Sequence, residues 1–421
     1  MYASFSKLRP ALHVLAVPMA VMVGAQFASA FPLRVIPVLL PVSSVAVGLP
    51  PTAIGYLASL ATVGSMIASL YTGYFVNRWG SARVLLFSMI CGLVASLFMC
   101  IPLALTFAIG SIFAGFGDGP TISAGNLVLS QGAPEEIRNT LFSLKMLGGP
   151  LGGISAGVLL PHAAALEGWW AGPLIAAVVV TVLAVSIKAT MPHWPEDRRR
   201  LRDSVQETLS IVAPLRLLFA FSPARRLALV GMALGLAQGV WYAYFIAYLV
   251  DELDRTIVFA GAAFSLSLAF GVVVRFVIAA VADVLKRAEG VFMLLAMCSA
   301  VPWFVLITLT PDSSDAIIMG VSALFGMTLG AWLGLQQAEI ARRTSPDSVA
   351  EVSGAAIFLM FVGLAASGAI FATSLAWSGG FRFGFVCLGM LAFAAGALGF
   401  WAAMTDQNRS HIPNVHRVDR E

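Results

Sequence analysis

The sequence contains few charged residues: 11% of its 421 positions, where a soluble domain has roughly 25%. A water-exposed surface needs roughly 25–35% charged residues, so this composition excludes a soluble globular protein. Hydrophobic residues make up 59% of the chain, which also excludes a disordered protein, because disorder requires low hydrophobicity. The composition therefore predicts a membrane protein with many spans.

Cysteine and histidine are also scarce, with four and five residues respectively. The cysteines lie inside apolar stretches and form no CxxC or Cys/His spacing, so we expect apolar filler and no metal site or cofactor. The sequence contains no nucleotide-binding loop, HExxH or GxSxG, so we expect no catalytic residues and no enzyme. A net charge of +4 is too small to indicate a nucleic-acid partner.

Long apolar runs, by contrast, are abundant. A helix needs about 20 apolar residues to cross the hydrocarbon core of a bilayer. We predict twelve spans, at 11–37, 51–75, 83–103, 104–131, 139–161, 171–190, 223–250, 257–282, 290–310, 314–341, 350–376 and 382–404.

The longest polar stretch divides these spans into two sets of six. Most of the 25 Lys and Arg residues fall on one side of the predicted topology. By the positive-inside rule, both termini and the central loop are expected to be cytoplasmic, and the Ala-rich composition favours a bacterial inner membrane. The expected domains are an N-terminal bundle (1–190), a cytoplasmic linker (191–222), a C-terminal bundle (223–404) and a cytoplasmic tail (405–421).

A short motif after the second span resembles the loop signature of the major facilitator superfamily. Gly73, Arg78, Gly80 and Arg83 match that signature, and Asn77 replaces its usual acid. The resemblance implies an all-α membrane protein with twelve transmembrane helices in two pseudo-symmetric six-helix bundles. It also implies transport by alternating access, with the binding site between the halves.

Further motifs resemble particular branches of that superfamily. Segment 149–153 resembles the antiporter motif Gly-Pro-x-x-Gly-Gly, and segment 142–152 resembles the cyanate-permease-like branch. The spacing of Arg275 and Asp283 resembles a pattern of the organic-anion and monocarboxylate carriers. Two departures oppose a drug exporter: Ser111 where such exporters carry arginine, and Lys145 where the antiporter motif has glycine.

Four charged residues lie well inside predicted spans: Arg34, Asp118, Lys145 and Arg275. A charge at the bilayer centre costs at least about 2.5–3.5 kcal/mol, so these residues are expected to face a cavity or a partner. Three are positive, and a guanidinium matches a carboxylate with two parallel hydrogen bonds. We therefore expect Arg275, Arg34 and Lys145 to bind a small organic anion. The alternatives are a structural Arg275, and snorkelling of Arg34 or Lys145 to an interface.

Other polar residues complete the expected site. Asp118 is the candidate for proton coupling, or alternatively a fixed counter-ion. Gln238, Trp241 and Tyr242 fall at i, i+3 and i+4 on one helix face, and Asn126 is a weaker candidate for substrate contact. Two loops six spans apart are expected to act in gating, through Asn77, Arg78, Arg83, Asp283, Lys286 and Arg287.

These observations predict a secondary active transporter for a small organic anion, expected to be a carboxylate. Coupling would be to protons or to a counter-substrate, by symport or antiport, because no ATP-binding loop is present. The alternative is a proton-driven exporter of drugs or metabolites, and a membrane sensor that has kept the fold is a third hypothesis. The expected partners are the substrate, the coupling ion and the lipid bilayer, with the protein acting as a monomer.

Overall fold

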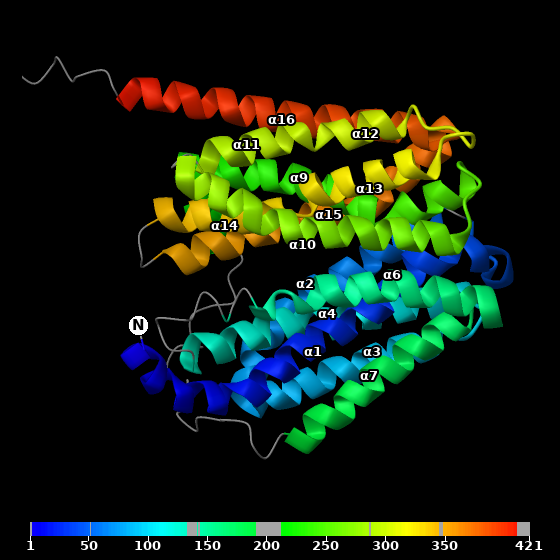
Figure 1. The fold of residues 1–421 in the computed structure, drawn as a ribbon, viewed down its shortest axis with the longest axis horizontal. Helices are drawn as coiled ribbons and strands as arrows, with labels where there is room; N and C mark the ends of the chain where they lie inside the picture. The colour runs from blue at the N-terminus through cyan, green and yellow to red at the C-terminus, as the bar shows by residue number, and fades with distance from the viewer. Residues whose placement is uncertain are drawn as a thin grey trace, which may run out of the picture.

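The computed structural model describes residues 2–50, 52–132, 141, 144–190, 212–285, 288–344 and 348–410. Every regular element in these residues is an α-helix, and the helices lie roughly parallel in two layers (Figure 1). The lower layer in that view is the N-terminal half and the upper layer is the C-terminal half.

The N-terminal half contains six long helices. Tight turns at Gly80 (φ +86°) and Gly168 (φ +99°) reverse the chain between successive helices, and glycine adopts these positive φ values without a steric penalty. The helices are α1 (Tyr2–Val47), α2 (Ala53–Trp79), α3 (Ser81–Met99), α4 (Ala104–Gly132), α6 (Gly148–Glu167) and α7 (Ala171–Thr190).

The C-terminal half repeats this arrangement with two of its helices broken. α11 (Ala288–Cys298) continues into α12 (Ala300–Leu306), and α13 (Asp315–Leu329) continues into α14 (Trp332–Arg343). A short helix, α8 (Val212–Ala220), lies inside the range expected to be a linker. The remaining helices are α9 (Ser222–Asp251), α10 (Ile257–Leu285), α15 (Val349–Ser378) and α16 (Phe381–Ser410).

In the described part of the chain, the helices other than the short α8 form twelve rods that overlap the twelve predicted spans, when each broken pair is counted as one rod. Eleven of these rods are long and apolar enough to cross a membrane. The remaining rod is α4, whose middle contains Asp118 and Pro120. Most helices continue past the C-terminal end of the predicted span; α1, for example, continues to Val47 rather than residue 37.

The two halves meet backbone to backbone at one end of the molecule. Gly55 near the start of α2 packs against Gly368 of α15, and Gly157 of α6 packs against Gly261 near the start of α10. A Cβ atom at any of these four glycines would overlap atoms of the opposite half. The helices can therefore approach this closely only because glycine has no side chain.

Tyr244 of α9 reinforces this contact with two hydrogen bonds to the N-terminal half. The N–H of Gly55 donates to the Tyr244 hydroxyl (3.1 Å), which donates to the carbonyl of Thr52 (3.0 Å). The N–H of Ala369 also donates to Ser59 Oγ (3.2 Å). We call this region, formed by the two glycine pairs and Tyr244, the sealed end. It is the end that the Lys/Arg pattern predicts to face outside.

Candidate functional site

A cavity of about 330 Å³ lies between the two halves. Its walls come from α1, α2, α4 and α6 on one side and from α9, α10, α13, α14 and α15 on the other. In the part of the chain that the structure describes, α3, α7, α11, α12 and α16 contribute no wall residue. The volume is within the range of sites that enclose a small molecule.

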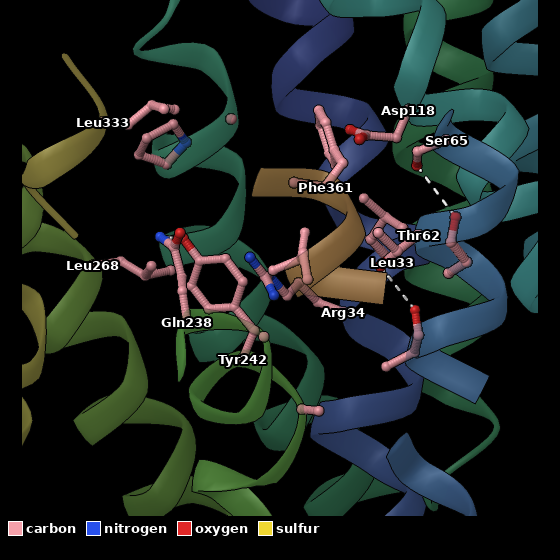
Figure 2. Close-up of a pocket in the computed structure, with 18 of the residues that line it drawn as sticks. Leu33, Arg34, Thr62, Ser65, Asp118, Gln238, Tyr242, Leu268, Leu333 and Phe361 are labelled. Carbon is pink, nitrogen blue, oxygen red and sulfur yellow. Dashed lines mark hydrogen bonds between the residues drawn. The ribbon is translucent and has the colours of Figure 1, made fainter. Parts of the chain in front are cut away.

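Arg34 extends from α1 across the cavity to the opposite half (Figure 2). Its Cζ lies 4.3 Å from the ring centroid of Tyr242 on α9 and 5.3 Å from that of Phe264 on α10. A guanidinium stacked on an aromatic face gains about 0.5–2 kcal/mol, depending on how far it is desolvated. Its Nε is buried without a hydrogen-bond partner. Arg34 is therefore held by aromatic rings and keeps hydrogen-bonding capacity for a ligand.

Arg275 lies on the wall formed by α10. Its Nη2 donates to the carbonyl of Gly330 (3.1 Å), in the break between α13 and α14, and its Nε is buried without a partner. Gly271 and Gly330 allow this approach, because a Cβ at Gly271 would lie 3.1 Å from the Gly330 Cα. Arg275 thus bonds a backbone carbonyl and also lines the cavity, and substrate contact by its guanidinium stays a prediction.

Asp118 is the only carboxylate among the described residues that line the cavity. Its Oδ1 accepts a hydrogen bond from Ser29 on α1 (3.0 Å), and it interacts electrostatically with Arg34. Figure 2 shows Asp118 on the same side as Thr62 and Ser65, facing Arg34 and Tyr242. The arrangement fits both hypotheses for Asp118, a counter-ion or a proton acceptor.

The structure does not place Lys145 on the cavity wall. Its side chain is completely buried in the N-terminal half, where Nζ donates to the carbonyl of Ile122 (2.6 Å) beside Gly125. Snorkelling to water is equally inconsistent with this burial. The sequence shows that Lys145 is a charged residue inside a span. It does not show which way the side chain points, because that depends on how α1, α4 and α6 pack.

Gln238 and Tyr242 line the cavity together, whereas Trp241 does not. Gln238 Nε2 donates to the Tyr242 hydroxyl (3.0 Å) and to the carbonyl of Leu329 (3.0 Å). Trp241 is fully buried, with its ring 5.9 Å from Phe264 and 6.0 Å from Phe325. Successive helix residues differ by about 100° in direction, so Trp241 points into the aromatic core of the C-terminal half.

Several residues of the predicted site lie outside the part of the chain that the structure describes. Lys286 and Arg287 lie outside the described residues, as do the side chains of Asn77, Asn126 and Asp283. Arg78 and Arg83 are described and exposed, and Arg78 Nη1 donates to the Tyr74 hydroxyl (3.3 Å). The gating role of these loops therefore stays a prediction.

Several polar wall residues were not predicted from the sequence, namely Gln26, Thr62, Ser65 and Ser367. Small hydroxyl residues are common wherever membrane helices pack, so their presence in a span carries little information about a cavity. Gln26 could have been identified from the sequence as a candidate wall residue, because an amide deep inside the first span needs a polar partner. Its Oε1 is buried without one.

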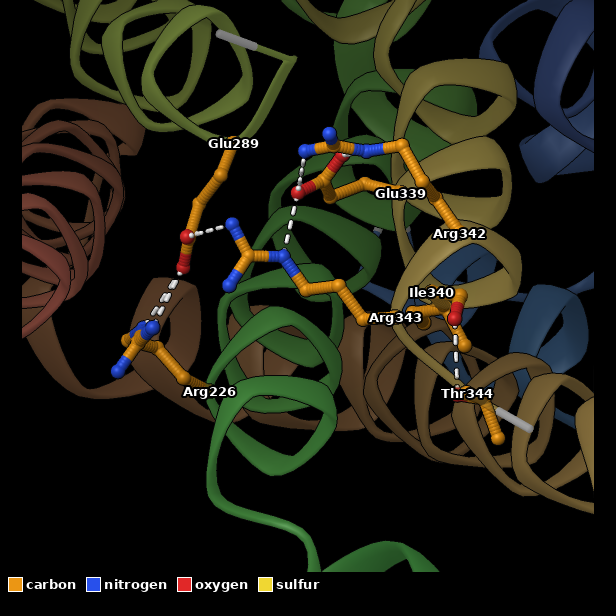
Figure 3. A network of polar contacts seen from close by, with 7 residues as sticks. All are labelled: Arg226, Glu289, Glu339, Ile340, Arg342, Arg343 and Thr344. Carbon is orange, nitrogen blue, oxygen red and sulfur yellow. Dashed lines mark hydrogen bonds and ion pairs between the residues drawn. The ribbon is translucent and has the colours of Figure 1, made fainter. Parts of the chain in front are cut away.

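A second polar cluster lies outside the cavity, within the C-terminal half (Figure 3). Glu289 on α11 accepts from Arg226 on α9 (2.7 Å) and from Arg343 on α14 (2.7 Å). Glu339, also on α14, accepts from Arg343 (2.5 Å) and Arg342 (2.8 Å). The cluster ties three helices together, and its members are not among the described residues that line the cavity, so we assign it a structural role.

Comparison with known proteins gives the same architecture. The family model described as Major Facilitator Superfamily matches residues 22–368. The nucleoside transporter NupG (D323A mutant) has a TM-score of 0.72 and 14% identity, covering 91% of this chain and 99% of that chain. The D-xylose-proton symporter has a TM-score of 0.73 and 14% identity, covering 92% and 97%.

Among characterised sequences, Inositol transporter 4 of Arabidopsis thaliana is 25% identical over 153 residues, or 35% of this chain. The chain spans about a quarter (26%) of that relative. The structural matches confirm the predicted fold class, with twelve membrane helices in two six-helix bundles. The family match covers most of the sequence. The chain belongs to the Major Facilitator Superfamily.

Proposed function

We propose that the protein is a secondary active transporter that moves a small organic anion, a carboxylate, across the cytoplasmic membrane. The observation that carries this proposal is the charge of the cavity. Arg34 from one half and Arg275 from the other line it, and Asp118 is the one carboxylate among the described wall residues. The wall therefore has a formal charge of +1, which favours anions over cations.

The environment of the two arginines supports a carboxylate ligand. The positive charge of Arg34 interacts with the carboxylate of Asp118. Arg275, by contrast, bonds an uncharged carbonyl, and that bond leaves its positive charge unbalanced. Both guanidiniums also have buried Nε atoms without partners. A ligand carboxylate would satisfy these donors through charge-assisted hydrogen bonds.

Transport by alternating access fits the position of the cavity. The ligand would sit between two halves that contact each other at the sealed end, and rocking of the halves would break that contact and expose the cavity to the other side. The contacts of the two predicted gating loops would form and break during the same motion.

Asp118 is the candidate for coupling to protons. A substrate that draws Arg34 away from Asp118 removes the positive charge that stabilises the carboxylate, so Asp118 would then take up a proton more readily. One protein of similar structure is the D-xylose-proton symporter, which supports proton coupling as part of the proposal. Exchange against a counter-substrate is the alternative.

The test is ligand-dependent stabilisation of the purified protein, with variants at Arg275 and Arg225. The panel would contain mono- and dicarboxylates, inorganic anions and lipophilic cations. Carboxylates should stabilise the wild type, and Arg275→Gln should abolish this effect. Arg225→Gln is the matched control, because Arg225 is exposed at the start of α9, away from the cavity, and should behave as the wild type. Stabilisation by lipophilic cations alone, unchanged in Arg275→Gln, would refute the proposal in favour of a drug exporter.

A further inference from the structure

The polar side chains that line the cavity differ between its two walls. On the wall formed by the N-terminal half, Asp118, Thr62, Ser65 and Gln26 offer hydrogen-bond acceptors; on the wall formed by the C-terminal half, Arg275 and Tyr242 offer donors beside the acceptor oxygens of Gln238 and Ser367. In Figure 2, Asp118, Ser65 and Thr62 lie opposite Gln238 and Tyr242. A ligand that satisfies both walls must carry acceptors at one end and donors at the other.

On the acceptor wall, the hydroxyl hydrogens are already used. Thr62 Oγ1 donates to the carbonyl of Ala58 (3.0 Å), and Ser65 Oγ lies 3.2 Å from the carbonyls of Ala61 and Gly115. A hydroxyl has one hydrogen and two lone pairs, so both side chains present lone pairs to the cavity.

Two further groups strengthen this wall as an acceptor surface. Asp118, when ionised, can only accept hydrogen bonds. Gln26 is 4% exposed and its Oε1 has no hydrogen-bond partner, although the residue lines the cavity. A buried polar atom without a partner is destabilising, so a ligand hydroxyl that reaches it would be favoured.

On the opposite wall, which we call the donor wall, Tyr242 and Arg275 retain hydrogens for a ligand. The Tyr242 hydroxyl accepts from Gln238, which leaves its own hydrogen for a ligand. Arg275 uses Nη2 on Gly330 and retains its other N–H groups. Arg34 belongs to the N-terminal half, but its guanidinium lies over the Tyr242 ring and so adds a second cation to this wall.

While Asp118 is ionised, the charges of the cavity favour a ligand with a single negative charge, because the described wall residues Arg34, Arg275 and Asp118 sum to +1. One carboxylate neutralises that charge, whereas a dicarboxylate leaves −1 and a zwitterionic amino acid leaves +1. The donors facing the acceptor wall must then be uncharged, which hydroxyl groups are.

We propose that the substrate is a polyhydroxy monocarboxylate, with its carboxylate at Arg275 and its hydroxyls facing Asp118, Gln26, Thr62 and Ser65. This inference rests on the proposed function and specifies the substrate class of the same cavity. The carboxylate would bind the C-terminal half and the hydroxyls the N-terminal half, so the ligand would link the two bodies that move during transport.

The experiment compares three six-carbon probes by titration of the purified protein, following ligand-induced thermal stabilisation. Gluconate has one carboxylate and five hydroxyls, hexanoate has the carboxylate alone, and sorbitol has hydroxyls alone. Gluconate should bind at least about tenfold more tightly than hexanoate, because hexanoate leaves the acceptor wall unsatisfied. Sorbitol should show no stabilisation at the same concentrations, because it leaves both arginines without an anion.

A double variant tests whether Thr62 and Ser65 cause the preference for gluconate over hexanoate. Thr62→Val keeps the side-chain shape, and together with Ser65→Ala it removes both hydroxyl acceptors. This double variant should lose most of the preference for gluconate and keep the wild-type affinity for hexanoate, which also reports that it is folded. Equal affinity for gluconate and hexanoate in the wild type would overturn this inference and leave the carboxylate proposal standing. Tighter binding of the dicarboxylate glucarate would overturn the single-charge argument, and failure of every carboxylate to bind would overturn the proposed function itself.

Discussion

The polar cluster of the C-terminal half gives a stability prediction that can be worked out from the structure. Glu339 is completely buried and accepts hydrogen bonds from Arg342 Nε (2.9 Å) and Nη2 (2.8 Å) and from Arg343 Nε (2.5 Å). The substitution Glu339→Gln removes the negative charge while keeping the shape of the side chain. Breaking a buried ion pair by removing one partner costs about 3–5 kcal/mol.

Two features of the cluster reduce that cost. The Arg342 side chain is 59% exposed, so water replaces much of its interaction, and exposed pairs contribute about 0–1 kcal/mol. Arg343 keeps its ion pair with Glu289 (2.7 Å). We therefore expect Glu339→Gln to lower the free energy of unfolding by about 2–3 kcal/mol. In a domain of this size, 1 kcal/mol shifts the melting temperature by about 2–4 °C, so the expected decrease is about 4–12 °C.

The assay is thermal unfolding of the purified protein in detergent, followed by intrinsic tryptophan fluorescence. The matched control is Asp315→Asn, which removes a carboxylate that is 66% exposed and lies 3.4 Å from Arg255. This control should change the melting temperature by less than about 4 °C, because it is a surface pair. If Glu339→Gln melts within the range of this control, the buried cluster does not stabilise the C-terminal half as argued.

Three further predictions concern the sealed end and coupling. Tyr244→Phe removes two hydrogen bonds between the halves, each contributing about 0.5–1.5 kcal/mol, so the population open at this end should rise by roughly 5- to 150-fold. A cysteine introduced at Ala58, in a background without native cysteines, should then react faster with an impermeant thiol reagent added from that side. Gly55→Val should abolish transport by preventing closure, whereas Gly320→Val, where nothing lies within 4 Å of the added Cβ, should leave transport rates unchanged. Asp118→Asn should make uptake insensitive to an imposed proton gradient, and an unchanged gradient dependence would exclude Asp118 from coupling.

The twelve helices could be predicted from the sequence because a bilayer imposes a simple requirement on length and hydropathy. The charged cavity residues Arg34, Asp118 and Arg275 could be found for a related reason, since an unpaired charge in lipid is costly. The length and hydropathy of a span, and the depth of a charged residue within it, can both be read from the sequence without knowledge of the neighbouring helices.

The direction in which each side chain points could not be predicted in the same way. Lys145 and Trp241 are both buried inside one half rather than at the interface between halves, and only the packing of other helices decides this. Thr62 and Ser65 carried no signal at all, because hydroxyl residues satisfy their own helix backbone equally well at any position. Identifying the acceptor wall therefore required the three-dimensional structure.

The sealed end shares none of its principal residues with the cavity. The contacts at this end involve Gly55, Gly368, Gly157, Gly261 and Tyr244, and none of these five is among the described residues that line the cavity. Under the proposed mechanism, substitutions in the wall change the ligand that is bound and leave the contacts between the halves intact. A designer who wished to redirect the protein to a new cargo would keep these five positions constant and vary the residues of the two walls.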